Sequence, residues 1–212
     1  KTPLNSLLNF SEIISTEYET LEKSELKEMG EIMLQNSKRL NKTIEKYLLY
    51  VHAKFLMYDS EKVNELKKHY SVFDSYLITK AAAVSELFQQ RKNDLFVEGD
   101  EPIRFAIPLD YCIYILEQLL DNAFRYSEVG SVIKVTLKEI SGVPSLEIRD
   151  YGAGLTTDQI ENIGGFSQFG RKRLEQQGLG LGLSTSMIFC ELFSLKVDIE
   201  SAIGKGTKIV LH

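Results

Sequence analysis

The sequence predicts an α+β fold in which an antiparallel helical hairpin is followed by an α/β sandwich. Residues 4–57 contain no proline and a single glycine, Gly30, and their apolar residues recur at intervals of three, four or seven, which indicates amphipathic helices. After residue 58, short alternating segments predict strands, and these are segregated from the helices. Segregation favours a sandwich over a doubly wound sheet. We therefore expect two domains, at residues 1–62 and 63–212.

The first domain is expected to be a helical hairpin that pairs with a second copy. A first helix begins near Leu4, and residues 18–25 lack the apolar stripe. Ser24 is a fair N-cap with Glu25 and Glu28 in the turn beyond it, so a second helix is expected near residues 24–57. A hairpin of this length cannot bury its stripe alone. The simplest partner is a second copy, which gives a dimeric four-helix bundle.

The second domain is expected to mix helices and short strands. A helix is predicted over residues 75–93, before strands at 95–97 and 103–107. A helix over 110–126 follows Pro108, and two strands near 132–139 and 146–149 are joined by a turn with the sequence SGVP. A glycine-punctuated stretch then leads to a helix near 183–194 and a final hairpin of strands 197–200 and 207–211.

Composition excludes some functions. A formal net charge of −5 argues against a general nucleic-acid-binding surface, and the basic run at residues 171–173 is too short to reverse it. No segment approaches the ~20 apolar residues of a membrane span, so this fragment is expected to be cytoplasmic. The chain lacks an initiator Met and reads as a fragment, so membrane anchoring of the full-length protein stays open. Cys112 and Cys190 are expected to be buried free thiols.

Polar residues that suit a phosphorylated ligand lie on the helix over 110–126. Within its sequence LLDNAFRY, at residues 119–126, Asn122 offers an amide oxygen that suits Mg²⁺, an ion that takes few protein ligands. Arg125 supplies positive charge for phosphate, and Tyr126 a hydroxyl donor. The alternative is an amphipathic helix that merely exposes a polar face.

Two glycine-rich segments follow. In DYGAG, at residues 150–154, an aspartate at a strand end can offer its carboxylate to an amine while the glycines let the chain turn tightly against a flat ligand. In GLGLGL, at residues 178–183, backbone N–H groups at a helix start can meet phosphate. A plain turn is the alternative for the first, but the order and spacing of the two together are uncommon.

These segments resemble the signature boxes of the sensor histidine kinases of two-component signalling, within the GHKL ATPase superfamily. Residues 119–126 resemble the asparagine box, 150–154 the aspartate-glycine box, and 166–169 the phenylalanine box. Residues 178–182 resemble the second glycine box, and 204–207 the final glycine-threonine segment. The five matches occur in order between residues 116 and 211. The resemblance implies a GHKL-type α/β sandwich that binds ATP and Mg²⁺.

The resemblance also implies residue roles. Asn122 would bind Mg²⁺, Arg125 and Tyr126 the phosphates, and Asp150 the adenine amine, with Thr207 near the base through water. Residues 164–182 would form a mobile lid, for which the alternative is that its phenylalanines belong to the core. The remaining residues implied at the nucleotide or in the lid are Gly152, Gly154, Gly178, Leu179, Gly180, Leu181, Gly182, Phe166, Phe169 and Arg171.

Two features bear on the reaction. Hydrolysing relatives carry a glutamate where this chain has Gln118, and an amide cannot act as a general base, so ATP hydrolysis is disfavoured. The opening residues KTPLN resemble the end of the phosphoacceptor box, whose histidine would precede Lys1 by three positions. Thr2 would then have a possible role in dephosphorylating the partner, or else only form the helix start. The histidines at positions 52, 69 and 212 do not replace the missing one.

The expected function is thus phosphoryl transfer from ATP to a histidine, with relay to an aspartate on a response-regulator receiver domain that docks near residues 4–30. Residues 1–62 would serve dimerisation and histidine phosphotransfer, and 63–212 would bind ATP. Two rivals remain open: a GHKL ATPase that drives conformational change, and a degenerate kinase that acts as a nucleotide-gated phosphatase or scaffold. The input signal, the cognate regulator and the choice between cis and trans transfer are not encoded in any motif.

Overall fold

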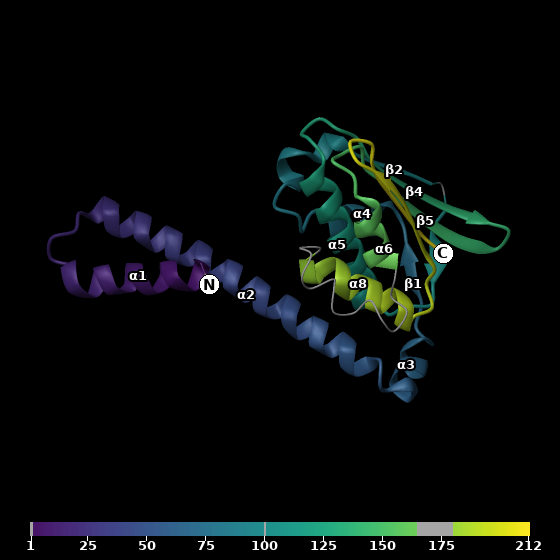
Figure 1. Cartoon of the computed structure of the whole chain (residues 1–212), viewed down its shortest axis with the longest axis horizontal. Coiled ribbons are helices and arrows are strands. Elements are labelled where there is room, and N and C mark those ends of the chain that lie inside the picture. The colour runs from purple at the N-terminus through teal and green to yellow at the C-terminus, as the bar shows by residue number, and fades with distance from the viewer. Residues whose placement is uncertain (1, 100, 165–179) are drawn as a thin grey trace. The chain divides into compact units, whose positions relative to one another are not determined.

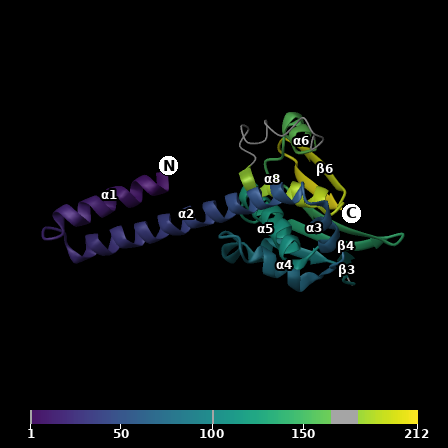
Figure 2. The ribbon, with the colours of Figure 1, turned by 90° about the horizontal axis from the view of Figure 1, so that it is seen from below.

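A computed structural model describes residues 2–99, 101–164 and 180–212. The chain divides into two compact units, Lys1–Val51 and His52–His212. The first contains helix α1, Thr2–Glu17, and most of helix α2, Lys23–Leu56. Figures 1 and 2 both show α1 lying alongside the first part of α2, so the predicted helical hairpin is confirmed.

The start of α2 differs from the prediction. The sequence predicts Ser24 as the cap of this helix, but α2 begins at Lys23, so Ser24 lies inside the first turn. The Glu25 carboxylate instead accepts a hydrogen bond from the Glu22 backbone N–H, at 2.9 Å. Longer acidic side chains can reach back to a helix entry in this way and satisfy a free N–H group.

The hairpin leaves its apolar stripe accessible. No residue from Pro3 to Val51 is fully buried, and Leu8 and Leu48 expose 59% and 61% of their surface. Two helices alone cannot enclose a core, which is the physical reason for an open stripe. None of the helices in the described part of the chain has the length and apolar content to cross a membrane.

The second unit is built on a five-stranded sheet with the order β2-β4-β5-β7-β6. The strands are β2 Leu95–Glu98, β4 Ile133–Ile140, β5 Val143–Arg149, β6 Val197–Ala202 and β7 Gly206–Leu211. Strands β2 and β4 are parallel, and the other neighbours are antiparallel. A separate two-stranded sheet pairs β1, Ser71–Phe73, with β3, Ile103–Phe105.

Helices cover one face of the sheet, as Figures 1 and 2 show for α4, α5 and α8. Their bounds are α4 Ser75–Ala82, α5 Leu109–Tyr126 and α8 Gly180–Leu192, with α3 Ser60–Leu66 and α6 Thr157–Gly164 as further helices. The α/β sandwich predicted from the sequence is therefore confirmed.

The core lies between α5 and the sheet. Alternate residues of β4 face inward, so Ile133, Val135 and Leu137 are buried while the residues between them are not. Helix α5 supplies the opposite wall, including Leu116, Leu120 and Phe124, which are almost completely enclosed. Because α5 is fixed along its length by this packing, it is a rigid support for any side chain on its other faces.

Two predicted elements were wrong in extent. The helix over 75–93 ends at Ala82 and gives way to two 3₁₀ turns, η1 Phe88–Gln90 and η2 Lys92–Asp94, because the Arg91 side chain turns inward to bond the Ser127 carbonyl at the end of α5 and the Asp94 carboxylate. The turn expected over 141–144 contains only Ser141 and Gly142, both with positive φ, and β5 begins at once with Val143.

Candidate functional site

Two of the predicted residues on α5 line a cavity of about 480 Å³. Asn122 and Tyr126 lie four residues apart, so they share one side of the helix, and both border the cavity. Arg125 points elsewhere: it does not line the cavity, it is 57% exposed, and its guanidinium lies 3.0 Å from the Asp121 carboxylate. The helix thus presents an amide and a phenol to the cavity, and an ion pair beside it.

Asp150 follows β5 directly and places a carboxylate in the same cavity. The residue is 9% exposed. Oδ1 accepts hydrogen bonds from the backbone N–H groups of Gly152, at 2.9 Å, and Thr207, at 3.3 Å. Burial raises the pKa of the Asp150 carboxyl above its ordinary value, and the two N–H donors offset this only in part. No cation among the described residues is paired with it, so this carboxylate is suited to accept a hydrogen bond from a ligand.

Glycines are required in the loop after Asp150 because other backbone comes too close for a side chain. A Cβ on Gly152 would collide with the Tyr126 carbonyl, and one on Gly154, whose φ is +69°, would collide with the Ala202 carbonyl. Backbone hydrogen bonds from Ala153 to Tyr126 O, at 2.9 Å, and from Gly204 to Ala153 O, at 2.7 Å, fix the loop between α5 and the β6–β7 turn. Gly154 lines the cavity, whereas Gly152 does not and packs against the backbone of Tyr126.

Thr207 reaches the cavity from β7, and its hydroxyl is oriented by Ser201 of β6. Ser201 Oγ donates to the Gly206 carbonyl at 2.7 Å and accepts from the Leu155 N–H at 2.8 Å. A hydroxyl has one proton, so in the 2.9 Å contact between the two side chains Thr207 is the donor. Its lone pairs are then left for a ligand. Sequence reasoning missed Ser201, because its role arises only from strand pairing.

The rest of the cavity wall was also missed from the sequence. It is mainly apolar, and apolar residues in strands and helices carry no signal that separates a cavity wall from a core. The wall residues beyond those predicted are Leu119, Ala123, Ile148, Ala153, Leu155, Thr156, Gln159, Leu183, Ile203 and Ile209. Thr156 and Gln159 exchange side-chain hydrogen bonds with each other's backbone and so cap α6 at the cavity edge. A flat apolar group with a polar edge fits this lining.

The second glycine segment is only partly described. Helix α8 begins at Gly180, and Gly182 packs against the carboxamide of Gln118, where a Cβ would collide with that side chain. Leu181 and Gly182 do not line the cavity. The predicted Phe166, Phe169, Arg171, Gly178 and Leu179 lie outside the described residues. Thr2 begins α1, in the other unit, and its side chain is likewise not described.

The side chains around the cavity indicate which kind of metal site it could form. No group of three His, Cys, Asp or Glu side chains converges anywhere in the described ranges. Mg²⁺ instead takes one or two protein oxygens and completes its shell with phosphate and water, and the Asn122 amide at the cavity fits that pattern.

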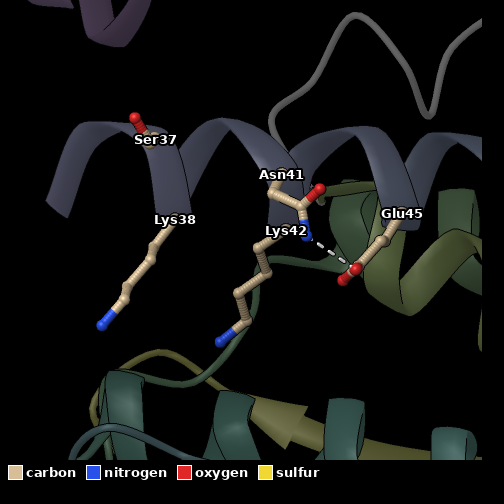
Figure 3. Close-up of a pocket in the computed structure, with 5 residues that line it drawn as sticks. All are labelled: Ser37, Lys38, Asn41, Lys42 and Glu45. Atoms are coloured by element: carbon tan, nitrogen blue, oxygen red, sulfur yellow. Dashed lines mark hydrogen bonds between the residues drawn. The ribbon is translucent and has the colours of Figure 1, made fainter. Parts of the chain in front are cut away.

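A second hollow lies on α2, in the hairpin unit, and is shown in Figure 3. Its five lining residues are Ser37, Lys38, Asn41, Lys42 and Glu45, all exposed and all from one helix. Asn41 donates a hydrogen bond to Glu45 at 2.7 Å, and the two lysines point in the same direction. A single helix face cannot surround a ligand, so this hollow is an open charged surface.

Comparison with known proteins agrees with the geometry. Residues 110–212 match the family "Histidine kinase-, DNA gyrase B-, and HSP90-like ATPase". Among curated relatives, the sensor histidine kinase YvrG of Bacillus subtilis (strain 168) and the sensor protein SrrB of Staphylococcus aureus (strain NCTC 8325 / PS 47) are each 26% identical over the whole chain. The chain covers 36% and 35% of their lengths, so it spans about a third of these relatives.

Solved structures show the same fold. The histidine kinase AdeS of Acinetobacter baumannii superposes with a TM-score of 0.66 at 18% identity, over 99% of this chain and 93% of that one. Full-length ShkA, in a complex with AMPPNP, gives a TM-score of 0.61 at 17% identity, over 100% of this chain and 42% of that one. Residues 110–212 therefore belong to the histidine kinase-, gyrase B- and HSP90-like ATPases, and the chain as a whole is similar to sensor histidine kinases.

Proposed function

We propose that this chain transfers the γ-phosphoryl group of ATP to a histidine three positions before Lys1, from which the group passes to an aspartate of a response-regulator receiver domain. The observation that carries the proposal is the buried Asp150 carboxylate in a mainly apolar cavity that Asn122 and Tyr126 of α5 also line. The family of residues 110–212 and the two sensor proteins similar to the whole chain support the same activity.

Asp150 and Thr207 would recognise the adenine base of ATP. Oδ1 of Asp150 is held by two backbone N–H groups, so the carboxylate keeps one orientation in which it accepts from the exocyclic amine. Thr207 donates to Ser201 and so offers lone pairs toward the base through water. Apolar side chains such as Ile148, Leu155 and Ile209 would pack against the faces of the adenine ring. The similar protein ShkA was solved in a complex with AMPPNP, an adenine nucleotide analogue, which supports this assignment.

The phosphates would extend from the base along α5. Asn122 would hold Mg²⁺ through its amide oxygen, and Tyr126 would donate a hydrogen bond to phosphate. When bound, Mg²⁺ supplies neutralisation of the phosphate charge. Arg125 is exposed beside the cavity, so it would reach phosphate by leaving Asp121. The glycines at 178–182 would contribute backbone N–H donors, and Phe166, Phe169 and Arg171 would belong to a lid that closes over the nucleotide.

In the reaction, a ring nitrogen of the acceptor histidine attacks the γ-phosphorus. A nitrogen–phosphorus bond forms, the bond from phosphorus to the β–γ bridging oxygen breaks, and that oxygen keeps the electron pair on ADP. Gln118 supports transfer over hydrolysis, because its neutral amide is packed against Gly182 and cannot take a proton from water. Positioning and charge neutralisation would supply most of the catalysis.

The hairpin would bring the acceptor and the partners together. Its exposed stripe, which includes Leu8 and Leu48, would be buried against a second copy in a four-helix bundle, with residues 1–62 as the dimerisation and phosphotransfer domain and 63–212 as the ATP-binding domain. The receiver domain would dock near residues 4–30, and Thr2 would orient water when the regulator is dephosphorylated. No nucleic acid is expected as a partner, in line with the net charge of −5.

A labelling experiment tests this function. A form of the chain extended upstream of Lys1 is incubated with Mg²⁺ and ATP labelled at the γ-phosphate. We expect acid-labile, base-stable label on the protein that disappears when the upstream histidine is changed to glutamine, and that a purified receiver domain removes. Asp150→Asn should strongly reduce labelling, whereas Asp198→Asn, on a half-buried strand position that does not line the cavity, should not. Free phosphate without labelled protein would show an ATPase instead.

A further inference from the structure

Arg91, in the segment between α4 and β2, is buried together with its charge. Only 2% of it is exposed, and its side chain lies over the Phe124 ring, with 5.4 Å between the guanidinium carbon and the ring centroid. A buried guanidinium is costly unless each N–H finds an acceptor. Here Nε donates to Asp94 Oδ2 at 2.6 Å, and both terminal nitrogens donate to backbone carbonyls. Each nitrogen of this side chain is therefore used as a donor.

The carbonyls that Arg91 bonds belong to the end of α5 and the turn after it. They are those of Phe124, Ser127 at 3.0 Å, Glu128 at 2.6 Å and Ser131 at 3.3 Å. The last carbonyls of a helix have no partner within the helix, and the negative end of the helix dipole favours a cation there. Arg91 satisfies both requirements at once, so it acts as the C-terminal cap of α5.

Asp94 completes this cap from the other side. Its Oδ2 accepts from Arg91 Nε and from the Gly130 backbone N–H, at 3.0 Å. The bond to Arg91 is the main reason that the pKa of the Asp94 carboxyl is lowered, so the carboxylate stays charged. The turn after α5 is thereby held at Gly130 as well as at the helix end.

The capped turn is also the part of α5 that meets the site. Tyr126, whose side chain lines the cavity, uses its carbonyl to accept from the Ala153 N–H at 2.9 Å, and Gly152 packs directly against that carbonyl. Asn122 lies one turn earlier on the same helix. One helical turn is thus held by Arg91 on one side and joined to the loop of Asp150 on the other.

We infer that Arg91 and Asp94 are positioning residues, which hold the last turn of α5 in register with the loop at residues 150–154 and so set the Asn122 and Tyr126 side chains in the cavity. Neither residue lines the cavity, so they act only through α5. Lysine is no substitute, because three donors on one nitrogen cannot reproduce the planar fork. That the ligand of this cavity is ATP or ADP is taken from the proposed function, on which the inference therefore rests.

The test compares Arg91→Lys with a control that lowers stability elsewhere in the same unit. Phe73→Leu shortens a buried ring that packs on Phe105 in the β1–β3 sheet, away from the cavity. Thermal unfolding, the dissociation constant for ADP by calorimetry, and hydrogen exchange of the Ala153 N–H by NMR are measured on the 212-residue chain. We expect both variants to unfold at lower temperature. Only Arg91→Lys should weaken ADP binding about tenfold and speed Ala153 exchange relative to global unfolding.

Asp94→Asn keeps Arg91 and provides a milder variant if Arg91→Lys does not fold; it should weaken ADP binding about threefold. Unchanged ADP affinity in a folded Arg91 or Asp94 variant, or a loss no larger than in Phe73→Leu, would overturn the inference. A wild-type chain that binds no ADP would defeat the proposed function instead. The Ala153 exchange rate would still decide whether Arg91 holds the turn.

Discussion

Asp150 and Thr207 are joined by two hydrogen bonds: the Asp150 backbone N–H donates to the Thr207 carbonyl at 2.9 Å, and the Thr207 N–H donates to Asp150 Oδ1 at 3.3 Å. The loop after β5 is therefore fixed to the start of β7 at the cavity. The carboxylate is oriented by neutral backbone donors while burial raises its pKa and so disfavours its charge. Its properties should then respond to substitution and to pH in ways that an exposed aspartate does not show.

Asp150→Asn should lose ADP affinity without losing stability. Asparagine keeps the shape and an oxygen for the two N–H donors, but it presents an NH₂ where the ligand amine needs an acceptor. We expect at least about a tenfold rise in the dissociation constant. At pH 7 the unfolding temperature should stay level or rise, because no charge is buried any longer.

The matched control is Asp198→Asn, in which an aspartate with a lowered pKa loses the charge that faces Lys196 and His212. That variant should be slightly less stable and should bind ADP as tightly as the unmodified chain. The interpretation fails if Asp150→Asn is the less stable of the two or still binds ADP normally.

ADP binding and the stability contribution of Asp150 should change with pH in opposite directions. Its folded-state pKa is raised, so its contribution to stability is fully present below the unfolded-state pKa, ordinarily 3.8, and is lost as the pH rises through the folded-state value. Binding needs the carboxylate, so affinity should fall as the pH drops toward that raised value. Titrations from about pH 4 to pH 8 measure both, and Asp150→Asn should show neither trend.

Gly154→Ala should destabilise the second unit more than a glycine change at a comparable backbone angle. Gly142 has φ +81° and open space around it, so Gly142→Ala should cost about 1–2 kcal/mol through backbone conformation alone. Gly154 has φ +69° and also faces the Ala202 carbonyl, so the chain must shift, which adds about 1–3 kcal/mol. Denaturant unfolding measures both. Equal losses would show that the close approach is not maintained in solution.

Leu48→Glu should convert a dimer into monomers. Leu48 belongs to the apolar stripe of α2 and is 61% exposed in the isolated chain, so a dimer interface would bury it and a carboxylate there would be desolvated. Light scattering after size-exclusion chromatography gives the mass. Lys42→Glu, which places the same charge on an exposed position outside the stripe, should leave the dimer intact. A monomeric unmodified chain would remove the basis for a four-helix bundle.

The site could be predicted from the sequence where backbone geometry dictates the residue. Gly152 and Gly154 are glycines because neighbouring carbonyls leave no room for a Cβ, and such positions appear in the sequence as a fixed pattern after Asp150. Asn122 and Tyr126 could be placed together because residues four apart lie on the same side of a helix. Arg125 showed the limit of that reasoning, since its charge is directed at Asp121 and not into the cavity.

The hairpin, the sandwich and the polar and glycine residues Asn122, Tyr126, Asp150 and Gly154 of the cavity could be predicted from the amino-acid sequence alone, because they depend on periodicity and on short backbone motifs. The role of Ser201, the short α4, and the cap that Arg91 and Asp94 form on α5 emerge only from the folded chain. The partners in the Ser201 and Arg91 contacts come from different elements. A hydroxyl that orients Thr207 across paired strands, or a cation that ends a helix from another segment, becomes visible only when folding brings the groups into contact.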